Sequence, residues 1–215
     1  MERTSAGERA SEVVNEADIA RWYEGCVFSS DWTTSHFPVW TEVLAAHRHR
    51  PARVLEIGSW EGRSALFFLH YLAGSSLTCV DTFEGSVEHH ENASLAPSVA
   101  DVERRFDANT ARFADRIEKI RGTSGSVLPL LGIAGRRFDI VYVDGSHYAA
   151  DVYGDAALAW SLTVSGGLVL FDDYDWNLME TESERPRLGI ETFLRTVPGQ
   201  FREIHRDYQL IVEKL

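Results

Sequence analysis

Apolar positions along the chain form two patterns that alternate from residue 53 onward. Short continuous apolar runs predict β-strands at residues 53–57, 76–80, 117–121, 138–143 and 167–171. Apolar residues at helical spacing predict α-helices at residues 62–73, 149–162 and 189–197. Two further strands are predicted near the end, at residues 201–205 and 208–213. The short connection between them, Arg206-Asp207, favours an antiparallel hairpin.

This alternation of strands and helices predicts an α/β fold. We expect a Rossmann-like, seven-stranded, mostly parallel sheet with a C-terminal antiparallel hairpin strand and helices on both faces. The strand at residues 117–121 contains Glu118 and Lys119, and such charges are typical of a strand at the edge of a sheet. Ligands of these sheets bind outside the carboxyl ends of the strands, so functional residues are expected there.

The first fifty residues do not show this alternation. Residues 11–22 are predicted to form an amphipathic helix, and Pro38 suits the first turn of a second helix that runs to about Arg50. We therefore divide the chain into an N-terminal helical segment, residues 1–50, that packs on the core, and a main domain, residues 51–215.

Composition narrows the class of protein. The 215 residues are 44% apolar, which is enough for a buried core, and carry a formal net charge of −12. The one compact basic cluster, residues 47–50, lies at the predicted helix end, where cations complement the helix dipole. A nucleic-acid-binding face is therefore not expected.

The same sequence lacks targeting and redox signals. No segment is apolar enough for a signal peptide or a membrane span, and the two distant cysteines, Cys26 and Cys79, predict neither a disulfide framework nor a zinc site. We expect a cytoplasmic protein with no membrane or nucleic-acid partner. A homo-oligomer is left open.

A glycine-containing turn follows the first strand. In Glu56-Ile57-Gly58-Ser59-Trp60-Glu61-Gly62 the glycines allow a tight turn and a close approach of the backbone to a ligand at the next helix. Asp81 ends the second strand, where a carboxylate can accept hydrogen bonds from both ribose hydroxyls. Together they predict a nucleotide-type ligand. A plain tight turn is the alternative, and an NAD-binding oxidoreductase would carry Gly-x-Gly-x-x-Gly, with glycine in place of Glu56.

Residues 54–64 resemble motif I of the class I S-adenosylmethionine-dependent methyltransferases. The resemblance covers residues 50–215 and is closest to the metal-dependent macrocin/sugar and catechol-type small-molecule O-methyltransferases. It implies that S-adenosyl-L-methionine is the cofactor, that Glu56 organises the loop near its methionine part, and that Asp81 binds its ribose. The residues that the resemblance assigns to the cofactor are Glu56, Gly58, Ser59, Trp60, Gly62, Ser64, Asp81, Thr82, Phe83, Thr123, Ser124 and Asp144. Many relatives carry an acid where Ser124 stands.

Three aspartates follow the fourth and fifth strands. Asp144 ends the fourth strand, and Asp172 and Asp173 end the fifth, so their carboxylates should converge at one sheet edge. Converging carboxylates repel unless a proton or a cation separates them, and an all-oxygen ligand set suits Mg²⁺ or another divalent ion. The alternative is that these aspartates cap a loop or a helix. The resemblance supports Asp144, Asp172 and Asp173 as metal ligands.

The general base is predicted to be His147, which with Asp144 forms the expected catalytic pair. It lies close to the acidic cluster in sequence, and imidazole suits proton transfer near neutral pH. The alternative is that His147 only supports the cluster or contacts the cofactor. His36, His89 and His90 are further candidates, and a metal-activated hydroxyl needs no strong base. Some sugar methyltransferases carry a second Asp where Ser146 stands, so that mechanism is not expected here.

We therefore predict an S-adenosylmethionine-dependent O-methyltransferase, assisted by a divalent metal, that acts on a small hydroxylated molecule such as a sugar in a natural-product pathway. The alternatives are a metal-independent methyltransferase of the same fold and a non-catalytic binder of S-adenosylmethionine. The N-terminal segment and the insert at residues 84–109, a candidate lid, are expected to determine the substrate.

Overall fold

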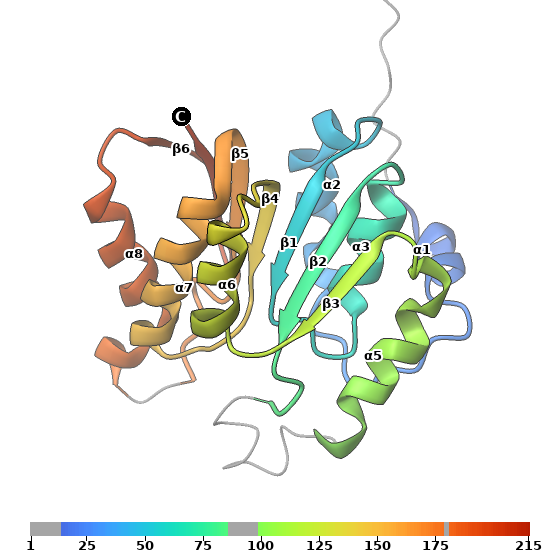
Figure 1. Ribbon diagram of the computed structural model, residues 1–215. Helices are drawn as coiled ribbons and strands as arrows, with labels where there is room; N and C mark the ends of the chain where they lie inside the picture. The colour runs from blue at the N-terminus through green and yellow to red at the C-terminus, as the bar shows by residue number, and fades with distance from the viewer. Residues whose placement is uncertain (1–13, 86–98, 179–180) are drawn as a thin grey trace, which may run out of the picture.

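The computed structural model describes residues 14–85, 99–178 and 181–215. Seven strands in these ranges form a single sheet of order β3-β2-β1-β4-β5-β7-β6 (Figure 1). They are β1 (Arg53–Ile57), β2 (Ser76–Asp81), β3 (Ile117–Arg121), β4 (Phe138–Val143), β5 (Thr163–Phe171), β6 (Phe201–Arg206) and β7 (Leu210–Lys214). Pairs among the first five strands are parallel, whereas β7 runs antiparallel to both β5 and β6. The predicted fold class is confirmed, and β3 is an edge strand as its charges indicated.

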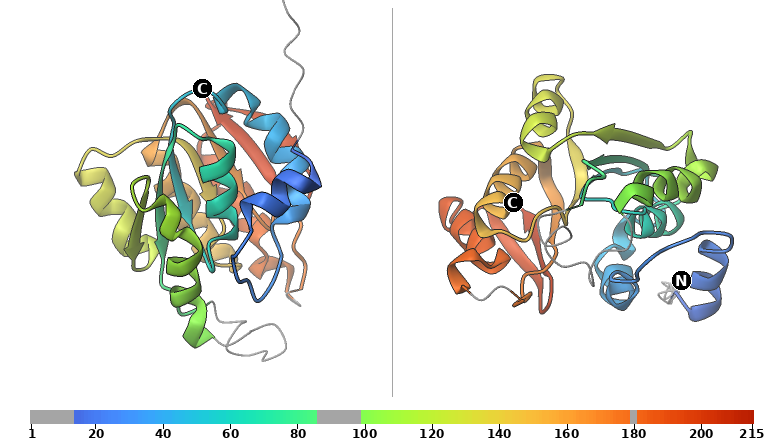
Figure 2. Two further views of the ribbon diagram at one scale, coloured as in Figure 1. Left: turned by 90° about the vertical axis from the view of Figure 1, so that its right-hand side faces the viewer. Right: turned by 90° about the horizontal axis from the view of Figure 1, so that it is seen from below.

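Helices cover both faces of the sheet. They are α1 (Glu16–Trp22), α2 (Phe37–Val43), α3 (Arg63–Tyr71), α5 (Val102–Thr110), α6 (Ser124–Ile133), α7 (Ala149–Leu162) and α8 (Pro186–Thr196), with short 3₁₀ turns at Thr34–His36, Ala45–His47, Val99–Asp101, Ala111–Phe113 and Glu182–Glu184. Helices α6, α7 and α8 pack on one face, and α1, α2, α3 and α5 on the other (Figure 2). None of the helices in the described ranges is long and apolar enough to cross a membrane.

Alternation along the strands divides the core in two. On β4, Val141 and Val143 face α6 to α8, while Ile140 and Tyr142 face α2 and α3. Period-two alternation produces this division because successive side chains of a strand point to opposite faces. Each large side chain buried in this way contributes roughly 1.5–3 kcal/mol, so both layers stabilise the sheet.

The N-terminal segment is part of the second core layer. The Trp40 side chain is fully buried, and its ring lies 5.1 Å from those of Phe67, Phe68 and Tyr142. The helix predicted to run from Pro38 to about Arg50 is shorter, because α2 ends at Val43. Leu44 is the last buried residue of that stretch, and only a short 3₁₀ turn at Ala45–His47 follows it.

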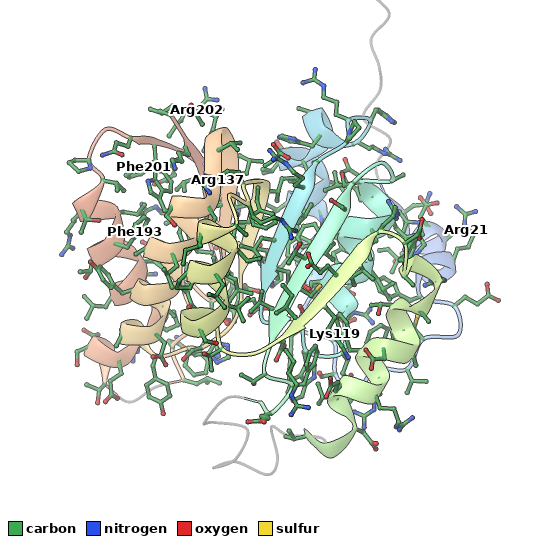
Figure 3. The ribbon with its side chains drawn as sticks, in the orientation of Figure 1. Arg21, Lys119, Arg137, Phe193, Phe201 and Arg202 are labelled. Carbon is green, nitrogen blue, oxygen red and sulfur yellow. The ribbon has the colours of Figure 1, made fainter. Side chains whose placement is uncertain are left out.

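The insert predicted as a lid contains a structural helix. Residues 86–98 lie outside the described residues, but α5 occupies the second part and leads into β3. A parallel pair such as β2 and β3 requires a crossover connection, which α5 supplies. Lys119 on β3, labelled in Figure 3, binds Glu103 and Asp107 of α5 at 3.0 and 2.6 Å. The helix was missed because its apolar signal is limited to Val102 and Phe106.

The C-terminal hairpin turn is longer than predicted. Strand β6 ends at Arg206 and β7 begins at Leu210, so Tyr208 and Gln209, which were predicted to lie in the strand, belong to the turn. Their side chains instead reach the carboxyl ends of β4 and β5, as described below.

His70 makes the stability of the fold sensitive to acid. Its ring stacks on Trp22 at 5.2 Å and meets the edge of Phe113 at 4.9 Å, and its Nε2 has no hydrogen-bond partner among the described residues. Burial, together with the Arg112 charge, lowers the pKa of His70 to about 4. Below about pH 6.5, His70 therefore binds a proton in the unfolded chain but stays neutral in the folded chain. The free energy of unfolding consequently falls as the pH decreases from 6.5 towards 4.

We predict that His70→Phe reduces this acid sensitivity. Urea unfolding at pH 7.5 and pH 5.0 should give a smaller difference in unfolding free energy for the variant than for the wild type. His49→Phe, at an exposed position, is the matched control and should retain the wild-type difference. An unchanged difference in His70→Phe would show that His70 is not the acid-sensitive group.

Candidate active site

A cavity of about 1270 Å³ lies at the carboxyl ends of β1, β2, β4 and β5. This is the lower edge of the sheet in Figure 1. The segments after these strands form its floor, and the N-terminal segment contributes a wall that includes Trp32 and His36. The sequence-predicted site residues that line it are Gly58, Ser59, Trp60, Ser64, Asp81, Thr82, Thr123, Ser124, Asp144, His147, Asp172 and Asp173.

Two glycines shape the loop after β1. Gly58 has φ of +82°, and a Cβ atom at this position would lie 1.8 Å from the carbonyl oxygen of Asp144. Gly62 has φ of +83° and caps α3, where a Cβ atom would lie 3.0 Å from the Thr110 side chain. A larger residue would push the loop away from the end of β4 at Gly58 or from α5 at Gly62, and both positions have positive φ, so both require glycine.

Asp81 holds this loop in place. Its Oδ2 accepts hydrogen bonds from the backbone N–H groups of Ser59 and Trp60 at 2.6 and 2.8 Å, and its Oδ1 accepts one from Phe83 N–H at 2.6 Å. A carboxylate has about four acceptor positions, so about one remains for a ligand. The Asp81 carboxylate thus fixes the loop. Without rearrangement it can accept only one of the two predicted hydrogen bonds from the ribose hydroxyls.

Glu56 lies beneath the loop rather than in the cavity wall. It is fully buried, and its Oε2 accepts hydrogen bonds from Ser59 Oγ at 2.6 Å and Cys79 Sγ at 3.2 Å. Burial raises the pKa of Glu56 to about 7, against the lowering effect of the Ser59 hydroxyl. No cationic side chain of the described ranges pairs with it. A positively charged ligand above the loop would favour its ionised form.

A crowded acidic cluster follows β4 and β5 and lines the same cavity. The Tyr142 hydroxyl is 2.9 Å from Asp144 Oδ2 and also contacts Asp172 Oδ2, although it has only one proton to donate. Burial, and then the neighbouring Asp172 and Asp173 charges, raise the pKa of Asp144 well above its ordinary value. Burial and the Asp173 charge raise the pKa of Asp172 in the same way. The cluster therefore holds a proton more readily than isolated carboxylates would, and a cation would relieve the same repulsion.

Asp172 and Asp173 have different surroundings. Asp172 Oδ1 accepts hydrogen bonds from Asp173 N–H at 2.8 Å and Gln209 Nε2 at 2.9 Å, so this carboxylate is bound by the protein. Asp173 has φ of +54°. Its Oδ2 lies 2.8 Å from His147 Nε2, and its Oδ1 accepts a hydrogen bond from the Tyr208 hydroxyl at 2.6 Å.

The residues that lie close enough together to share a metal ion differ from the predicted set. Ligand atoms of Asp144, His147 and Asp173 all lie within 4.8 Å of one another, whereas Asp172 is outside this group. Consecutive residues after a strand point in different directions, and Asp172 is turned towards Gln209. The group offers two carboxylates and one imidazole. Such a mixture of oxygen and nitrogen ligands suits a first-row transition ion better than it suits Mg²⁺, which typically has oxygen ligands only.

Some predicted residues do not reach the cavity. Phe83, expected beside the adenosine, is 4% exposed and packs on Phe106 with ring centroids 5.1 Å apart. Gly62 acts through the start of α3 and does not line the cavity. Trp60, Phe83 and Asp173 are the non-glycine residues with positive φ in the described ranges, and all three follow strand ends at the cavity. Such conformations cost energy and concentrate at functional sites.

The candidate histidines differ in their position relative to the cavity. His36 lines the cavity, stacks on Tyr208 at 5.5 Å, and has its Nε2 3.9 Å from Asp172 Oδ1. His89 and His90 lie outside the described residues. His147 is itself part of the candidate ligand group with Asp144 and Asp173, and its ring lies 4.8 Å from that of Trp176.

Sequence reasoning missed several residues of the site. Tyr142, Tyr208 and Gln209 were predicted only as strand residues and were given no role in the site. Asp155 on α7 lines the cavity although it is 6% exposed. A signal for Asp155 was present, because it shares an otherwise apolar helix face with Val152, Ala156 and Ala159, all of which are buried.

The chain is similar to known proteins in sequence and in fold. Residues 55–174 match the family model described as a methyltransferase domain. The O-methyltransferase hkm8 of Aspergillus hancockii is 32% identical over 124 residues, which are 58% of this chain and 43% of that protein. The chain spans only about half the length of the curated relatives it matches, between 43% and 59%.

Solved structures extend the likeness of the fold. MycE methyltransferase from the mycinamycin biosynthetic pathway, in complex with Mg, SAH and mycinamycin VI, has a TM-score of 0.63 and 19% identity, with coverage of 92% of this chain and 53% of that chain. An O-methyltransferase from Bacillus cereus in complex with SAH has a TM-score of 0.63 and 16% identity, covering 92% and 90%. The family match covers more than half of the chain, which therefore belongs to this methyltransferase-domain family.

We predict that Asp144→Asn stabilises the metal-free protein. The raised pKa of Asp144 means that ionising this cluster costs stability as the pH rises above about 4, and the amide removes one charge. At pH 8 with EDTA, the thermal midpoint should rise by about 2–4 °C for each kcal/mol gained. Asp139→Asn, which loses an ion pair with Arg53 on the surface, should not show this increase. A lower midpoint for Asp144→Asn would contradict a repulsive cluster.

Proposed function

We propose that this protein is an O-methyltransferase that transfers a methyl group from S-adenosylmethionine to a hydroxyl group of a small molecule. The observation that carries the proposal is the convergence of Asp144, His147 and Asp173 in the same cavity that the glycine-shaped loop after β1 lines. Membership of the methyltransferase family supports it.

The residues around the cavity fit a cationic cofactor. Glu56, Asp81, Asp144 and Asp155 place carboxylates under or around it, and carboxylates favour a ligand with sulfonium and ammonium groups. Ser59, Trp60 and Ser64 would hold the methionine part, and Asp81 and Thr82 the ribose. Thr123 and Ser124, at the start of α6, would lie beside the adenine ring of the cofactor. S-adenosylmethionine supplies an electrophilic methyl group on sulfur.

Asp144 and Asp173 would hold a divalent ion. The donor set fits, because their carboxylate oxygens lie within 4.8 Å of one another and their mutual repulsion favours a cation. A bound ion would supply Lewis-acid polarisation of a substrate oxygen and lower the pKa of a hydroxyl. The likeness to MycE, whose structure holds Mg, supports this part of the proposal.

His147 is the proposed proton acceptor. Asp173 Oδ2 lies 2.8 Å from its Nε2 and would stabilise the imidazolium that forms. In the transfer, a substrate oxygen forms a bond to the methyl carbon as the carbon–sulfur bond breaks, and the electron pair of that bond returns to sulfur. The hydroxyl proton passes to His147. The protein contributes mainly by aligning the reacting atoms, since in-line displacement depends on positioning.

The substrate side of the cavity has exposed apolar residues. Trp32 is 52% exposed with its ring 6.0 Å from Trp60, and Leu178 is 67% exposed beside Trp176. Tryptophan faces pack on sugar rings and on aromatic rings. We propose a hydroxylated substrate with an apolar face, such as a sugar or another intermediate of natural-product biosynthesis.

A metal-independent transfer is the second candidate. It is favoured by the existing contact between His147 and Asp173, which can activate a hydroxyl without an ion. A non-catalytic binder would retain affinity for S-adenosylhomocysteine but would transfer no methyl group to any substrate of a hydroxylated panel.

We predict that Asp173→Ala lowers turnover about 10²–10³-fold with little effect on cofactor affinity, because it acts on the substrate side of the cavity. Methyl transfer to a panel of hydroxylated sugars and phenols and calorimetric binding of S-adenosylhomocysteine would measure the two quantities. EDTA should abolish the wild-type activity, and Mn²⁺ or Mg²⁺ should restore it. Activity that is indifferent to EDTA would support the metal-independent candidate instead.

We also predict that His147→Gln reduces kcat by roughly 10²–10⁴-fold, the usual contribution of a general base. The decrease of kcat/KM at acid pH that protonation of the base causes should disappear. Metal affinity, measured from the Mn²⁺ dependence of thermal unfolding, separates the two possible roles. A large loss of metal affinity with an unchanged pH profile would make His147 a ligand rather than the base.

A further inference from the structure

Glu61 is a buried carboxylate that the proposed transfer does not use. It lies in the loop after β1, between Trp60 and Gly62, and is 1% exposed. Its charge is paired with Arg105 of α5. Its two oxygens also accept hydrogen bonds from Ser29, one from the backbone N–H at 2.6 Å and one from the hydroxyl at 2.7 Å. One carboxylate therefore joins the loop after β1, α5 and the N-terminal segment.

The stretch around Ser29 has little structure of its own. Residues 27–32 lie between α1 and the 3₁₀ turn at Thr34–His36, and none of them forms a backbone-to-backbone hydrogen bond with another described residue. Asn109 of α5 instead donates to the Val27 carbonyl at 3.0 Å and accepts from the Val27 N–H at 2.9 Å. Side chains from other parts of the chain therefore set the position of this stretch.

Residues 27–32 form part of the cavity wall. Phe28 and Trp32 line the cavity, and the half-exposed Trp32 ring lies 6.0 Å from that of Trp60. The buried Ser30 hydroxyl also belongs to this wall and has no hydrogen-bond partner among the described residues. The wall thus offers a ligand both aromatic faces and a free hydroxyl.

Two ionic contacts hold this wall, and they differ in burial. Arg63 binds Asp31 Oδ2 at 2.7 Å, but the Asp31 side chain is 45% exposed, and ion pairs open to water contribute little. The contacts of Glu61 are shielded from water, where hydrogen bonds to a charged group are stronger. Glu61 is therefore the stronger anchor.

We propose that Glu61 is a positioning residue that holds residues 27–32 against the loop after β1 and so sets the Trp32 wall for the methyl acceptor. The proposal rests on the proposed function, since it takes an acceptor to pack on this wall. Glu61 acts through Ser29 and not on the reacting atoms.

Loss of the Glu61 carboxylate should affect the two ligands differently. Asp81 would still hold the loop after β1 through the N–H groups of Ser59 and Trp60, so cofactor affinity should change little. The wall would lose its buried anchor, so the acceptor should bind more weakly. Contacts that are equally strong before and during the reaction affect KM rather than kcat.

Hydrogen–deuterium exchange of the full chain measures the wall without any substrate. Amides of residues 27–32 should exchange about tenfold faster in Glu61→Ala than in the wild type, because hydrogen bonds to a charged group are lost. Glu61→Gln retains an oxygen for Ser29 and should give an intermediate rate. Circular dichroism checks each fold, and the near-isosteric Glu61→Gln keeps the test valid if Glu61→Ala does not fold. Wild-type exchange in every folded variant would overturn the assignment.

Kinetics test the consequence for the reaction. With an acceptor from the hydroxylated panel, KM should rise about tenfold in Glu61→Ala and less in Glu61→Gln, while kcat stays nearly unchanged. Calorimetric affinity for S-adenosylhomocysteine should also stay close to that of the wild type. A loss of kcat and of cofactor affinity with an unchanged KM would overturn the assignment, because a general structural defect gives that pattern.

Asp101→Asn is the matched control. Asp101 Oδ2 is the other carboxylate oxygen near Arg105, at 3.6 Å, and it is not hydrogen-bonded to Ser29. Exchange of residues 27–32 and the acceptor KM should therefore remain as in the wild type. A wild type that methylates no acceptor of the panel would overturn the proposed function, whereas the exchange rates would still decide whether Glu61 holds the wall.

Discussion

One backbone contact governs the geometry of the candidate site. Gly58 lies so close to the carbonyl of Asp144 that no side chain fits between them, and the Asp144 N–H donates to the Ile57 carbonyl at 2.8 Å. The pairing of β1 with β4 therefore fixes the distance between the loop after β1 and the acidic cluster after β4. Any residue other than glycine would move the two halves of the cavity apart.

Around this contact the protein buries more negative charge than it neutralises. Burial raises the pKa of Glu56, Asp144, Asp155 and Asp172, and in each case the main opposing groups are hydroxyls, amides or histidines rather than Lys or Arg. A fold selected only for stability would replace or pair such groups. Their arrangement around one cavity is understandable if cationic ligands complete the electrostatic balance when they bind.

Hydrogen bonds from distant parts of the chain keep these carboxylates in place. Trp40 Nε1 donates to Gln209 Oε1 at 2.7 Å, and Gln209 Nε2 donates to Asp172 at 2.9 Å. The N-terminal segment and the C-terminal turn are thus connected through one amide to the end of β5. Each group in this series of hydrogen bonds is buried, so loss of one partner would leave another unsatisfied. The site therefore depends on both the N-terminal segment and the C-terminal turn.

The sequence by itself determined the strands, their mostly parallel order and the placement of chemistry at strand ends, because alternation of apolar runs and the glycines after β1 are local signals. It also identified Asp144, Asp173 and His147 as neighbours of one another. Only the tertiary structure decided that Asp172 turns to Gln209, that Phe83 enters the core and that Asp155 reaches the cavity. Those outcomes depend on side-chain direction and on contacts between residues far apart in the chain, which no local pattern encodes.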